Sequence, residues 1–286
     1  MKRHEVGEEE WAFLDPLIPK SEAKTGRPPR DRRQMLDGIL WILSTGAQRR
    51  DLPERFGPWE TVYGYFRKWR ADGLLDSIID ALHLRLDQQG KIDWDLWCID
   101  GTSVRGTRSA AGASKKSTAC HPEEPSDHGL GRSRGGFGTK IHLLVDGNGM
   151  PLEVEATAGR AHDSKRLEPI LKKVHVKQKR VRPKSRPKRL AGDKGYSSET
   201  LRRFLKNRGI EPIIPHKDNE KARHDPEVKF DKDAYKRRSI VEQSIGWLKE
   251  CRRIGTRFEK LAINFLAMIK VAMIKRALRL VFSNRA

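Results

Sequence analysis

The sequence predicts a mixed α/β fold preceded by an all-α region. Apolar residues recur at helical spacing through residues 1–90, and strand-like runs begin near Ile92. From residue 163 onward, helix and strand patterns alternate, which is typical of an α/β sheet with flanking helices. We therefore expect a helical region at 1–90 and an α/β region at 91–286, a length that can bury a substantial core.

Three helices are expected in the first region. The first covers residues 34–43, the second begins at Pro58, which suits a first helical turn, and the third covers residues 74–86. A tight break between the first two resembles a helix-turn-helix, whose second helix would enter a DNA groove. Three cations on that helix would then face DNA: Arg67, Lys68 and Arg70. A plain helical bundle with a solvated basic face remains the alternative.

Short strands dominate the start of the second region. Runs at 95–100, 137–146 and 151–159 predict a three-stranded meander with a long first connection. That connection, residues 101–136, is rich in Gly and Ser and is expected to be a flexible insert. The segments that follow alternate between helix and strand, at residues 163–174, 189–196, 198–207 and 210–215.

The chain is strongly basic. It has 59 Lys and Arg against 38 Asp and Glu, a net charge of +21, and such an excess attracts a polyanion, with nucleic acid the leading partner. On charge alone, a ribosome-associated or membrane-surface protein without chemistry stays open. Residues 172–189 concentrate the positive charge, and we interpret them as a phosphate-binding flap rather than a solvated spacer. Its candidate contacts are Lys184, Arg186 and Lys188.

Cysteine usage and hydropathy favour a protein of the cytosol. The three cysteines are odd in number and share no CxxC spacing, which indicates neither a disulfide framework nor a zinc site. The most apolar run lies in a long amphipathic helix expected at 259–282, where Lys and Arg residues interrupt it. We therefore expect it to pack against the protein rather than span a bilayer.

Two aspartates follow strand-like runs. Asp100 ends the first strand, and Asp193 follows another short strand, with Gly195 next to it to let the backbone turn. Functional sites in open α/β sheets gather at the carboxyl ends of strands. A turn-forming Asp is the alternative at either position, but two acids at two strand ends are a stronger signal than one.

A third carboxylate lies on the helix expected at 233–250. At about 100° per residue, four polar side chains of this helix fall within an arc of roughly 60°: Tyr235, Arg238, Glu242 and Lys249. The neighbouring face is apolar and should pack on the sheet, through Val241, Ile245 and Leu248. An exposed salt-bridge face is the common outcome of such a pattern. If the helix packs on the sheet, however, Glu242 is directed at the strand ends that carry the two aspartates.

Three converging carboxylates would repel one another unless cations lay between them. Oxygen-only ligation suits Mg²⁺ or Mn²⁺, and two such ions support in-line phosphoryl displacement. Arg238 and Lys249 would then grip DNA phosphates, and Tyr235 would stack on a base or only brace the helix. The residues alone therefore predict a metal-dependent nuclease or strand-transfer enzyme.

These residues resemble a known family. The spacing of Tyr235, Arg238, Glu242 and Lys249 is similar to the Y-(2)-R-(3)-E-(6)-K signature of IS4/IS5-type insertion-sequence transposases. The segments IDGTSVRG, GGFGTKIHLLVDGNGMPL and GDKGYSS also resemble the IS5 family, and the likeness covers nearly the whole chain. One departure is Arg50 in GAQRRDLP, where the family commonly has an aromatic residue.

The resemblance implies a ribonuclease H-like catalytic domain behind a helical DNA-binding region. It implies Asp100, Asp193 and Glu242 as the DDE catalytic triad and as ligands of two Mg²⁺ (or Mn²⁺) ions. The implied reaction is hydrolysis at transposon ends, followed by transesterification of the 3′-hydroxyls into target DNA.

The implied partners are the terminal inverted repeats and target DNA, in a homodimer or larger synaptic assembly and without a membrane. The resemblance also implies a cytoplasmic, nucleoid-associated bacterial protein. A catalytically silent regulator derived from a transposase, and a general ribonuclease H-like nuclease, are the alternatives.

Smaller candidates surround the predicted site. His162 and Asp163 would orient a ligand, or Asp163 would cap the following helix. His142 is interpreted as a structural residue of a strand. Lys194 and Tyr196 are candidate phosphate contacts. Zinc is disfavoured by the irregular spacing of three potential ligands: Cys120, His121 and His128.

Overall fold

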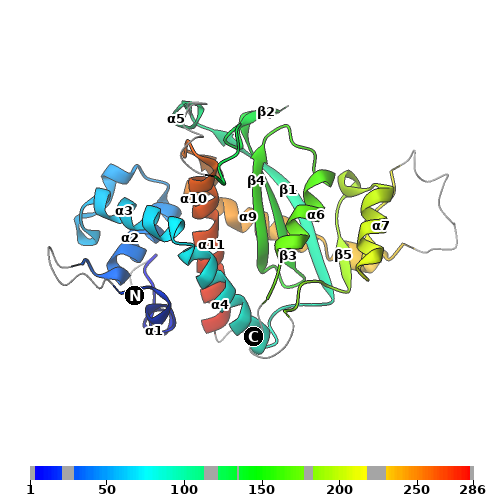
Figure 1. Cartoon of the computed structure of the whole chain (residues 1–286), viewed down its shortest axis with the longest axis horizontal. Coiled ribbons are helices and arrows are strands. Elements are labelled where there is room, and N and C mark those ends of the chain that lie inside the picture. The colour runs from blue at the N-terminus through cyan, green and yellow to red at the C-terminus, as the bar shows by residue number, and fades with distance from the viewer. Residues whose placement is uncertain are drawn as a thin grey trace.

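The computed structural model describes residues 4–20, 29–112, 122–133, 135–176, 183–217 and 230–283. A mixed sheet lies on one side of a long C-terminal helix, and the N-terminal helices lie on the other side (Figure 1). That central helix is α11 (Ala262–Phe282), coloured red in Figure 1. The α/β class with a preceding helical region is therefore the one that the sequence predicts.

The N-terminal region contains four α-helices: α1 (Glu8–Leu14), α2 (Arg32–Thr45), α3 (Trp59–Ala71) and α4 (Leu74–Gln88). Asp31 caps α2 by accepting hydrogen bonds from two backbone amides, and Gly46 ends the helix in a left-handed conformation with φ 68°. The α2–α3 connection covers residues 46–58 and contains two 3₁₀ turns. A helix-turn-helix uses a turn of about three or four residues, so this connection differs from that motif.

Helix α11 joins the N-terminal helices to the sheet. It contacts α1, α2, α3 and α4 as well as strand β4 (Pro151–Ala158). One apolar core runs through these elements, and it includes Leu40, Leu82, Val154 and Met273. The apolar core therefore continues across the predicted boundary near residue 90. No helix in the described ranges is long and apolar enough to cross a membrane.

The sheet is mixed, with both antiparallel and parallel strand pairs. Strands β1 (Leu96–Gly106), β3 (Gly136–Asp146) and β4 form an antiparallel meander, and β5 (Arg189–Ala191) and β6 (Glu211–Ile213) continue the sheet parallel to β1. Two short strands complete it: β2 (Gly131–Ser133) pairs with β3, and β7 (Thr256–Arg257) pairs with β1. The strand order along the main path of the sheet is β2-β3-β1-β5-β6.

Helices cover both faces of the sheet. Trp97 and Ile99 of β1 face a core shared with α6 (Ser164–Lys173) and α7 (Glu199–Asn207). The alternate residues Leu96 and Cys98 face the other core, which includes buried residues of α9 (Ser239–Glu250). The remaining short helices are α5 (Arg108–Ala111), α8 (Lys232–Lys236) and α10 (Arg252–Gly255).

Strand β1 is longer than the sequence predicts. It continues through Gly106, so Asp100 lies within the strand and not at its end. Thr102 and Val104 pair with β3, which provides the backbone partners that a Gly- and Ser-rich segment needs to form a strand. The prediction that residues 101–136 form a flexible insert is therefore wrong for its two ends; residues 113–121 and 134 lie outside the described residues.

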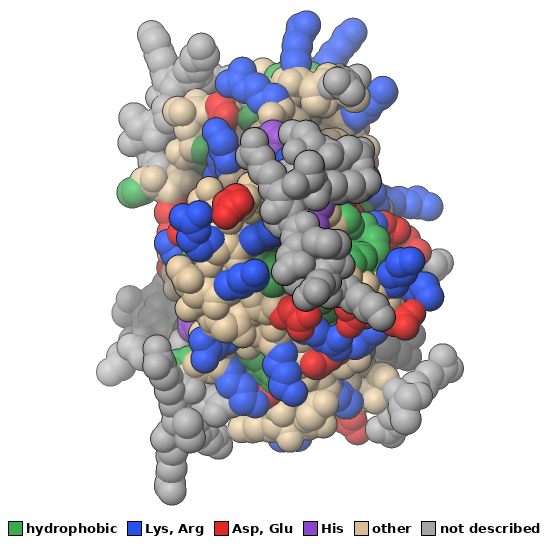
Figure 2. Space-filling model, turned by 90° about the vertical axis from the view of Figure 1, so that its right-hand side faces the viewer, with side chains coloured by type: hydrophobic (Ala, Val, Ile, Leu, Met, Phe, Trp, Pro, Cys, Tyr) green, Lys and Arg blue, Asp and Glu red, His purple; other side chains and the backbone are tan. Residues whose placement is uncertain are grey.

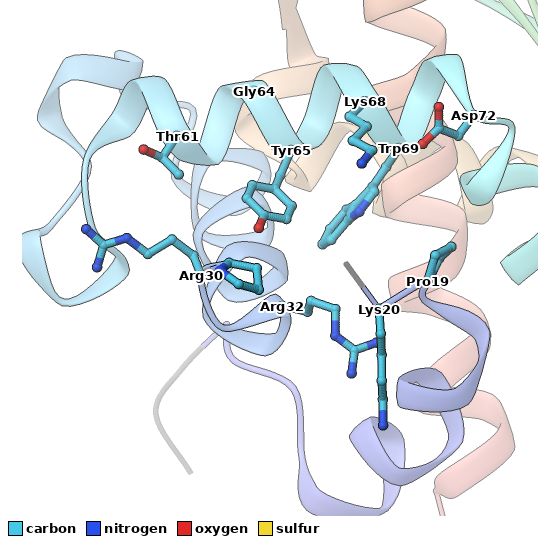
Figure 3. Close-up of a pocket in the computed structure, with 11 residues that line it drawn as sticks. Pro19, Lys20, Arg30, Arg32, Thr61, Gly64, Tyr65, Lys68, Trp69 and Asp72 are labelled. Atoms are coloured by element: carbon cyan, nitrogen blue, oxygen red, sulfur yellow. The ribbon is translucent and has the colours of Figure 1, made fainter. Parts of the chain in front are cut away.

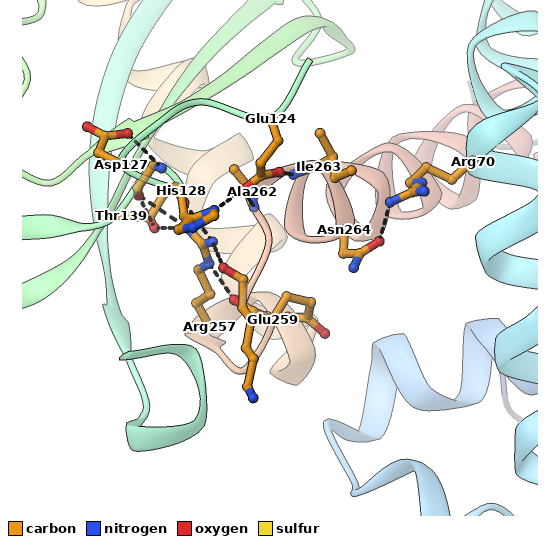
Figure 4. A network of polar contacts seen from close by, with 12 residues as sticks. Arg70, Glu124, Asp127, His128, Thr139, Arg257, Glu259, Ala262, Ile263 and Asn264 are labelled. Carbon is orange, nitrogen blue, oxygen red and sulfur yellow. Dashed lines mark hydrogen bonds and ion pairs between the residues drawn. The ribbon is translucent and has the colours of Figure 1, made fainter. Parts of the chain in front are cut away.

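A buried polar network fixes part of this insert to the C-terminal segment (Figure 4). Arg257 is fully buried and donates hydrogen bonds to Thr139 Oγ1 at 2.5 Å and to four backbone carbonyls. These carbonyls belong to His128, Gly129, Glu259 and Lys260, at 2.8–3.1 Å. Burial lowers the Arg257 pKa to about 10, so the guanidinium is still charged at neutral pH.

Glu124 extends the same network to helix α11. Its carboxylate accepts hydrogen bonds from the backbone amides of Ala262 at 2.8 Å and Ile263 at 3.0 Å, and it lies 2.7 Å from His128 Nδ1. These amides are among the unpaired donors at the start of a helix, where a negative charge is stabilising. The 122–130 segment is thereby held against α11.

We expect Arg257→Met to destabilise the fold by about 3–5 kcal/mol, because it removes a buried charge that satisfies five acceptors. Urea unfolding measures the change. Arg105→Met, at an exposed position of β1, is the control and should change the free energy of unfolding by less than about 0.5 kcal/mol. Equal stability of the two variants would contradict the role assigned to the network.

Asp37 is a buried carboxylate of α2. Its Oδ1 accepts a hydrogen bond from the Val6 amide at 2.8 Å. Burial raises the Asp37 pKa from 3.8 to about 6, although this hydrogen bond acts in the opposite direction. The folded state therefore holds the proton more tightly than the unfolded state, and stability falls as the pH rises from about 4 to 6.

Asp37→Asn should remove this pH-dependent loss, because the amide keeps an acceptor for Val6 but carries no charge. We expect the variant to gain about 1–3 kcal/mol over the parent at pH 7.5 and to gain nothing at pH 4. Urea unfolding at both pH values tests this, with the exposed Asp51→Asn as control. A gain that is the same at both pH values would show that ionisation of Asp37 is not its cause.

Candidate active site

The candidate site lies at a gap in the edge of β1. That edge pairs with β5 through residues 96–98 and with β7 through residues 105–106. Between these two stretches, residues 99–104 pair with no described strand on this edge, and Asp100 lies in the gap. Cys98 pairs with Ala191, so Asp100 and Asp193 each lie two residues beyond a paired position. The register thus directs the two aspartates toward each other.

Asp100 is a half-buried carboxylate. Its Oδ1 accepts a hydrogen bond from the Gly101 amide at 2.7 Å. Burial raises the Asp100 pKa, and the negative charge of Asp193 raises it further, whereas the Gly101 hydrogen bond and Arg238 act in the opposite direction. The two aspartates are therefore close enough to repel each other.

Asp193 is held by a tight turn. It caps a 3₁₀ turn, Lys194–Tyr196, and its Oδ1 accepts a hydrogen bond from the Gly195 amide at 2.8 Å. A Cβ atom at Gly195 would lie 2.9 Å from Asp193 Oδ1, which is closer than such contacts normally allow. Gly195 thus permits the side chain of Asp193 to fold over the turn.

Arg238 connects Asp100 with Glu242. Its Nη1 lies 3.1 Å from Asp100 Oδ2, and its Nη2 pairs with Glu242 Oε1. The side chains of Arg238 and Asp100 are 17% and 21% exposed, whereas that of Glu242 is 54% exposed. One guanidinium thus bridges a strand carboxylate and a helix carboxylate.

The helix predicted at 233–250 consists of two helices, α8 and α9, separated by Arg237 and Arg238. Both residues keep right-handed helical angles, so the chain direction is retained. The amide of Arg238 bonds to the carbonyl of Tyr235, three residues back, which tightens the chain at this point. The predicted inner face is present: Val241 and Leu248 are buried and Ile245 is half-buried.

The donor chemistry of the site suits a hard divalent cation, because its side chains offer carboxylate oxygens. Across the described part of the chain, however, no three His, Cys, Asp or Glu side chains are gathered closely enough to hold a metal ion. In this arrangement the positive charge between Asp100 and Glu242 is the Arg238 guanidinium.

The two remaining signature residues lie on either side of Glu242. The Tyr235 ring is half-buried, 5.3 Å from the Phe230 ring and 5.7 Å from the guanidinium carbon of Arg238. Tyr235 therefore braces Arg238 in this structure. Lys249 is exposed in the last turn of α9.

The three cations predicted on the second helix do not share one face of α3. Lys68 lines a cavity of about 710 Å³ together with Arg30 and Tyr65 (Figure 3). Arg70 points elsewhere, and its Nη1 donates to Asn264 Oδ1 of α11 at 2.7 Å. Arg67 is exposed. Arg70 therefore ties α3 to α11.

The described part of the basic loop makes contacts within the chain. Lys184 Nζ lies 3.0 Å from Asp87 Oδ1 and 5.1 Å from the centre of the Trp94 ring. Arg186 donates to the carbonyl of Arg208 at 2.5 Å, and Lys188 is exposed. Residues 177–182 of this loop lie outside the described residues. Figure 2 shows the right-hand side of the view in Figure 1, where Lys and Arg side chains are scattered with Asp and Glu among them.

A second polar cluster lies on the opposite face of β1. Asp163 pairs with Lys140 Nζ at 2.6 Å and with His142 Nδ1 at 3.4 Å. A Cβ atom at Gly101 would lie 2.5 Å from Asp163 Oδ1, so this ion pair packs directly on the strand. Asp163 makes no side-chain cap to α6, contrary to the capping alternative. Lys140 was missed because a lone cation in a strand pattern carries no signal of a partner.

Three of the smaller candidate residues are buried and belong to the interior of the fold. Tyr196 is fully buried, which rules out the predicted phosphate contact, and burial raises the pKa of its phenol. His142 is buried with Nε2 2.8 Å from Thr157 Oγ1, as expected of a structural histidine. His128 pairs with Glu124, while Cys120 and His121 lie outside the described residues. His162 is exposed, with Nδ1 2.8 Å from Ser164 Oγ.

Comparison with known proteins identifies two matching families. Residues 6–79 match the family described as "Putative transposase of IS4/5 family", and residues 95–274 match the family described as "Transposase DDE domain". The "Putative transposase for insertion sequence element IS402" of Burkholderia cepacia is 33% identical over 135 residues, 47% of this chain. The chain spans 60% of the length of that relative.

A second relative and one solved structure also align with this chain. The "Insertion element IS402 uncharacterized 16.2 kDa protein" of Burkholderia cepacia is 33% identical over 117 residues, which cover 39% of this chain and 77% of that protein. The "Crystal structure of the Mos1 Strand Transfer Complex" aligns with 84% of this chain and 83% of its own, at 15% identity and a TM-score of 0.24, a likeness too low to carry an argument. Because the DDE-domain match alone covers more than half of the residues, the chain belongs to the family of transposases with a DDE domain.

Proposed function

We propose that this chain is an insertion-sequence DNA transposase. In this proposal it binds the terminal inverted repeats, hydrolyses the phosphodiester bonds at the transposon ends and joins the 3′-hydroxyls to target DNA. The observation that carries the proposal is the pairing of one guanidinium, Arg238, with Asp100 of β1 and Glu242 of α9, at the gap toward which Asp193 is directed. Family membership supports the same function.

In the proposed mechanism, Asp100, Asp193 and Glu242 would hold the catalytic metal, two Mg²⁺ or Mn²⁺ ions. When bound, such ions supply activation of a water or 3′-hydroxyl and stabilise the leaving oxygen. Asp100 and Asp193 are set by a strand and a tight turn, which fixes their oxygens before substrate arrives. Glu242 is more than half exposed, so its side chain can change rotamer without repacking the core.

Arg238 has two roles in this proposal. Without metal it offsets the charge of two carboxylates. With cations held by these carboxylates, the guanidinium of Arg238 would be available for a bidentate contact with a DNA phosphate. Lys249 would add a second phosphate contact from the same helix, and Tyr235 would orient Arg238 or stack on a base near the cleaved bond.

The proposed DNA surface extends beyond the acids. Arg67, Lys68 and Lys188 are exposed and remain proposed contacts with DNA. The other predicted DNA contacts already bind within the chain and would have to release those interactions before binding a phosphate. These are Arg70, Lys184 and Arg186. Because two transposon ends must be held together, we propose a homodimer or larger assembly in the synaptic complex.

Glu242→Gln should lower the rate of end cleavage by at least about a thousandfold, because loss of one metal-binding carboxylate removes several kcal/mol of transition-state stabilisation. Binding of the terminal-repeat DNA should stay within about twofold of the parent. Cleavage of labelled repeat DNA with Mg²⁺ measures the first effect, and fluorescence anisotropy measures the second. Glu250→Gln, an exposed carboxylate on the same helix, is the matched control.

The same assay separates the alternatives. Parental cleavage by Glu242→Gln would remove this residue from the catalytic site. A parent protein that binds the repeats but never cuts them would be a silent regulator, and equal cutting of unrelated DNA would indicate a general nuclease.

Arg238→Gln should strengthen Mn²⁺ binding in the absence of DNA, because the guanidinium competes with the ion for Asp100 and Glu242. We expect the Mn²⁺ concentration that gives half of the thermal shift to fall by about tenfold, or about 1.4 kcal/mol. The neighbouring Arg237→Gln is the matched control, because Arg237 pairs with Asp93 at 2.6 Å. An unchanged or weaker response of Arg238→Gln would show that Arg238 does not occupy the place of the metal.

A further inference from the structure

A second cavity of about 780 Å³ lies where the N-terminal helices meet the segment that leads into α11. Five cations line it: Arg49, Arg50, Arg108, Arg253 and Lys260. The one acidic residue in its lining is Glu259. The lining therefore carries five positive charges against one negative charge, which favours an anionic ligand.

Aromatic rings orient three of the arginines. The guanidinium carbon lies 4.1 Å from the ring centre for Arg49 over Tyr63 and 4.9 Å for Arg253 over Phe258. The corresponding distance is 5.9 Å for Arg50 over Trp59. A ring on one face of a guanidinium limits its orientations and, for the exposed Arg50, leaves the N–H edge for an anion. The buried Arg253 instead donates to Glu259 Oε1 and to the carbonyl of Ala47. Since these rings already hold arginines, the cavity is suited to phosphate rather than to stacked bases.

Glu259 does not neutralise the cavity. Its side chain is 1% exposed and lies beneath two arginines, with Oε1 2.8 Å from Arg253 and 3.3 Å from Arg49. One buried carboxylate thus forms ion pairs with two arginines, and the other cations of the cavity have no acidic partner in the described part of its lining. Burial and the neighbouring Arg253 lower the pKa of Arg49, which indicates repulsion that a bound anion would relieve. Arg50, Arg108 and Lys260 are exposed around this pair.

The cavity is connected to the candidate active site by strand β1. Asp100 lies within this strand, and Thr107 and Arg108 follow directly after its end at Gly106. About seven residues of extended strand from Asp100 to Thr107 span about 23 Å at ~3.3 Å per residue. That length corresponds to about seven base pairs of duplex at ~3.4 Å per base pair.

We propose that this cavity binds the phosphate backbone of duplex DNA about seven base pairs from the bond that is cleaved. The inference rests on the proposed function, because it takes DNA as the substrate, and it adds a contact that neither α3 nor the basic loop provides. Arg50 adds to the positive charge of the cavity. The contact would hold the duplex while the carboxylates act on its end.

The salt dependence of DNA binding tests this proposal. We expect the double variant R50Q/R108Q to bind terminal-repeat duplex about ten- to thirtyfold more weakly than the parent near 0.15 M KCl, and the slope of log affinity against log salt to fall by about 1.8. The matched control R85Q/R279Q removes two exposed cations of α4 and α11 that lie outside the lining of the cavity. A slope equal to the parent's, or an equal loss in the control, would overturn the proposal.

Replacing single backbone phosphates with uncharged methylphosphonates locates the contact along the DNA. A methylphosphonate placed about seven nucleotides from the cleaved bond should weaken binding by the parent about fivefold and leave binding by R50Q/R108Q unchanged. Equal losses in both proteins at every position would overturn the proposal. Both measurements detect binding alone, so a parent that binds with these effects but never cuts DNA would refute the proposed transposase activity and leave the phosphate site intact.

Discussion

The arrangement of the candidate site depends on the interrupted edge of β1. If β5 continued alongside β1, its residues would cover the edge at Asp100, and Asp193 could not turn over the gap. Instead β5 ends at Ala191 and β7 resumes pairing only at residue 105. The gap brings two carboxylates together, and their repulsion is offset by the cation that directly precedes α9, Arg238. Because no described strand pairs here with this edge of β1, the edge is open at Asp100. The same gap places two carboxylates close enough to require a positive charge beside them.

The second constraint is the position of α11, which connects the helical region with the sheet. Arg257 and Glu124 tie the start of α11 to the insert after β1, and the apolar face of α11 continues into the N-terminal core. Arg70 and Asn264 add a polar contact between α3 and α11. The N-terminal helices are consequently held at a fixed distance from Asp100, and any DNA contact proposed on them would share that distance. In a chain of two independent domains, that distance would vary with the linker.

Most of the helices can be predicted from the spacing of apolar residues, because amphipathic helices such as α2, α3 and α7 bury one apolar face. The sequence could not locate the end of β1, since the GTSVRG segment has a loop-like composition and becomes a strand only through pairing with β3. It also could not show the tightened turn at Arg238, where backbone amides bond to carbonyls three residues back. The cation-lined cavity lay beyond sequence reasoning, because Arg49 and Glu259 meet only in the folded chain.

The spacing of the signature residues gains a physical meaning from the ion pairs of Arg238. Arg238 and Glu242 are four positions apart, so both side chains lie on one side of the helix and reach the same point above β1. Under the proposed function, cations and DNA would then assist each other, because Asp100 and Glu242 would leave the Arg238 guanidinium available to a phosphate when they held a cation. Such coupling is reciprocal by thermodynamic necessity, so DNA that engages Arg238 would also raise the affinity for the ions. The site would therefore reach its catalytic arrangement only when both are present, which would limit cleavage by metal-loaded protein away from its DNA ends.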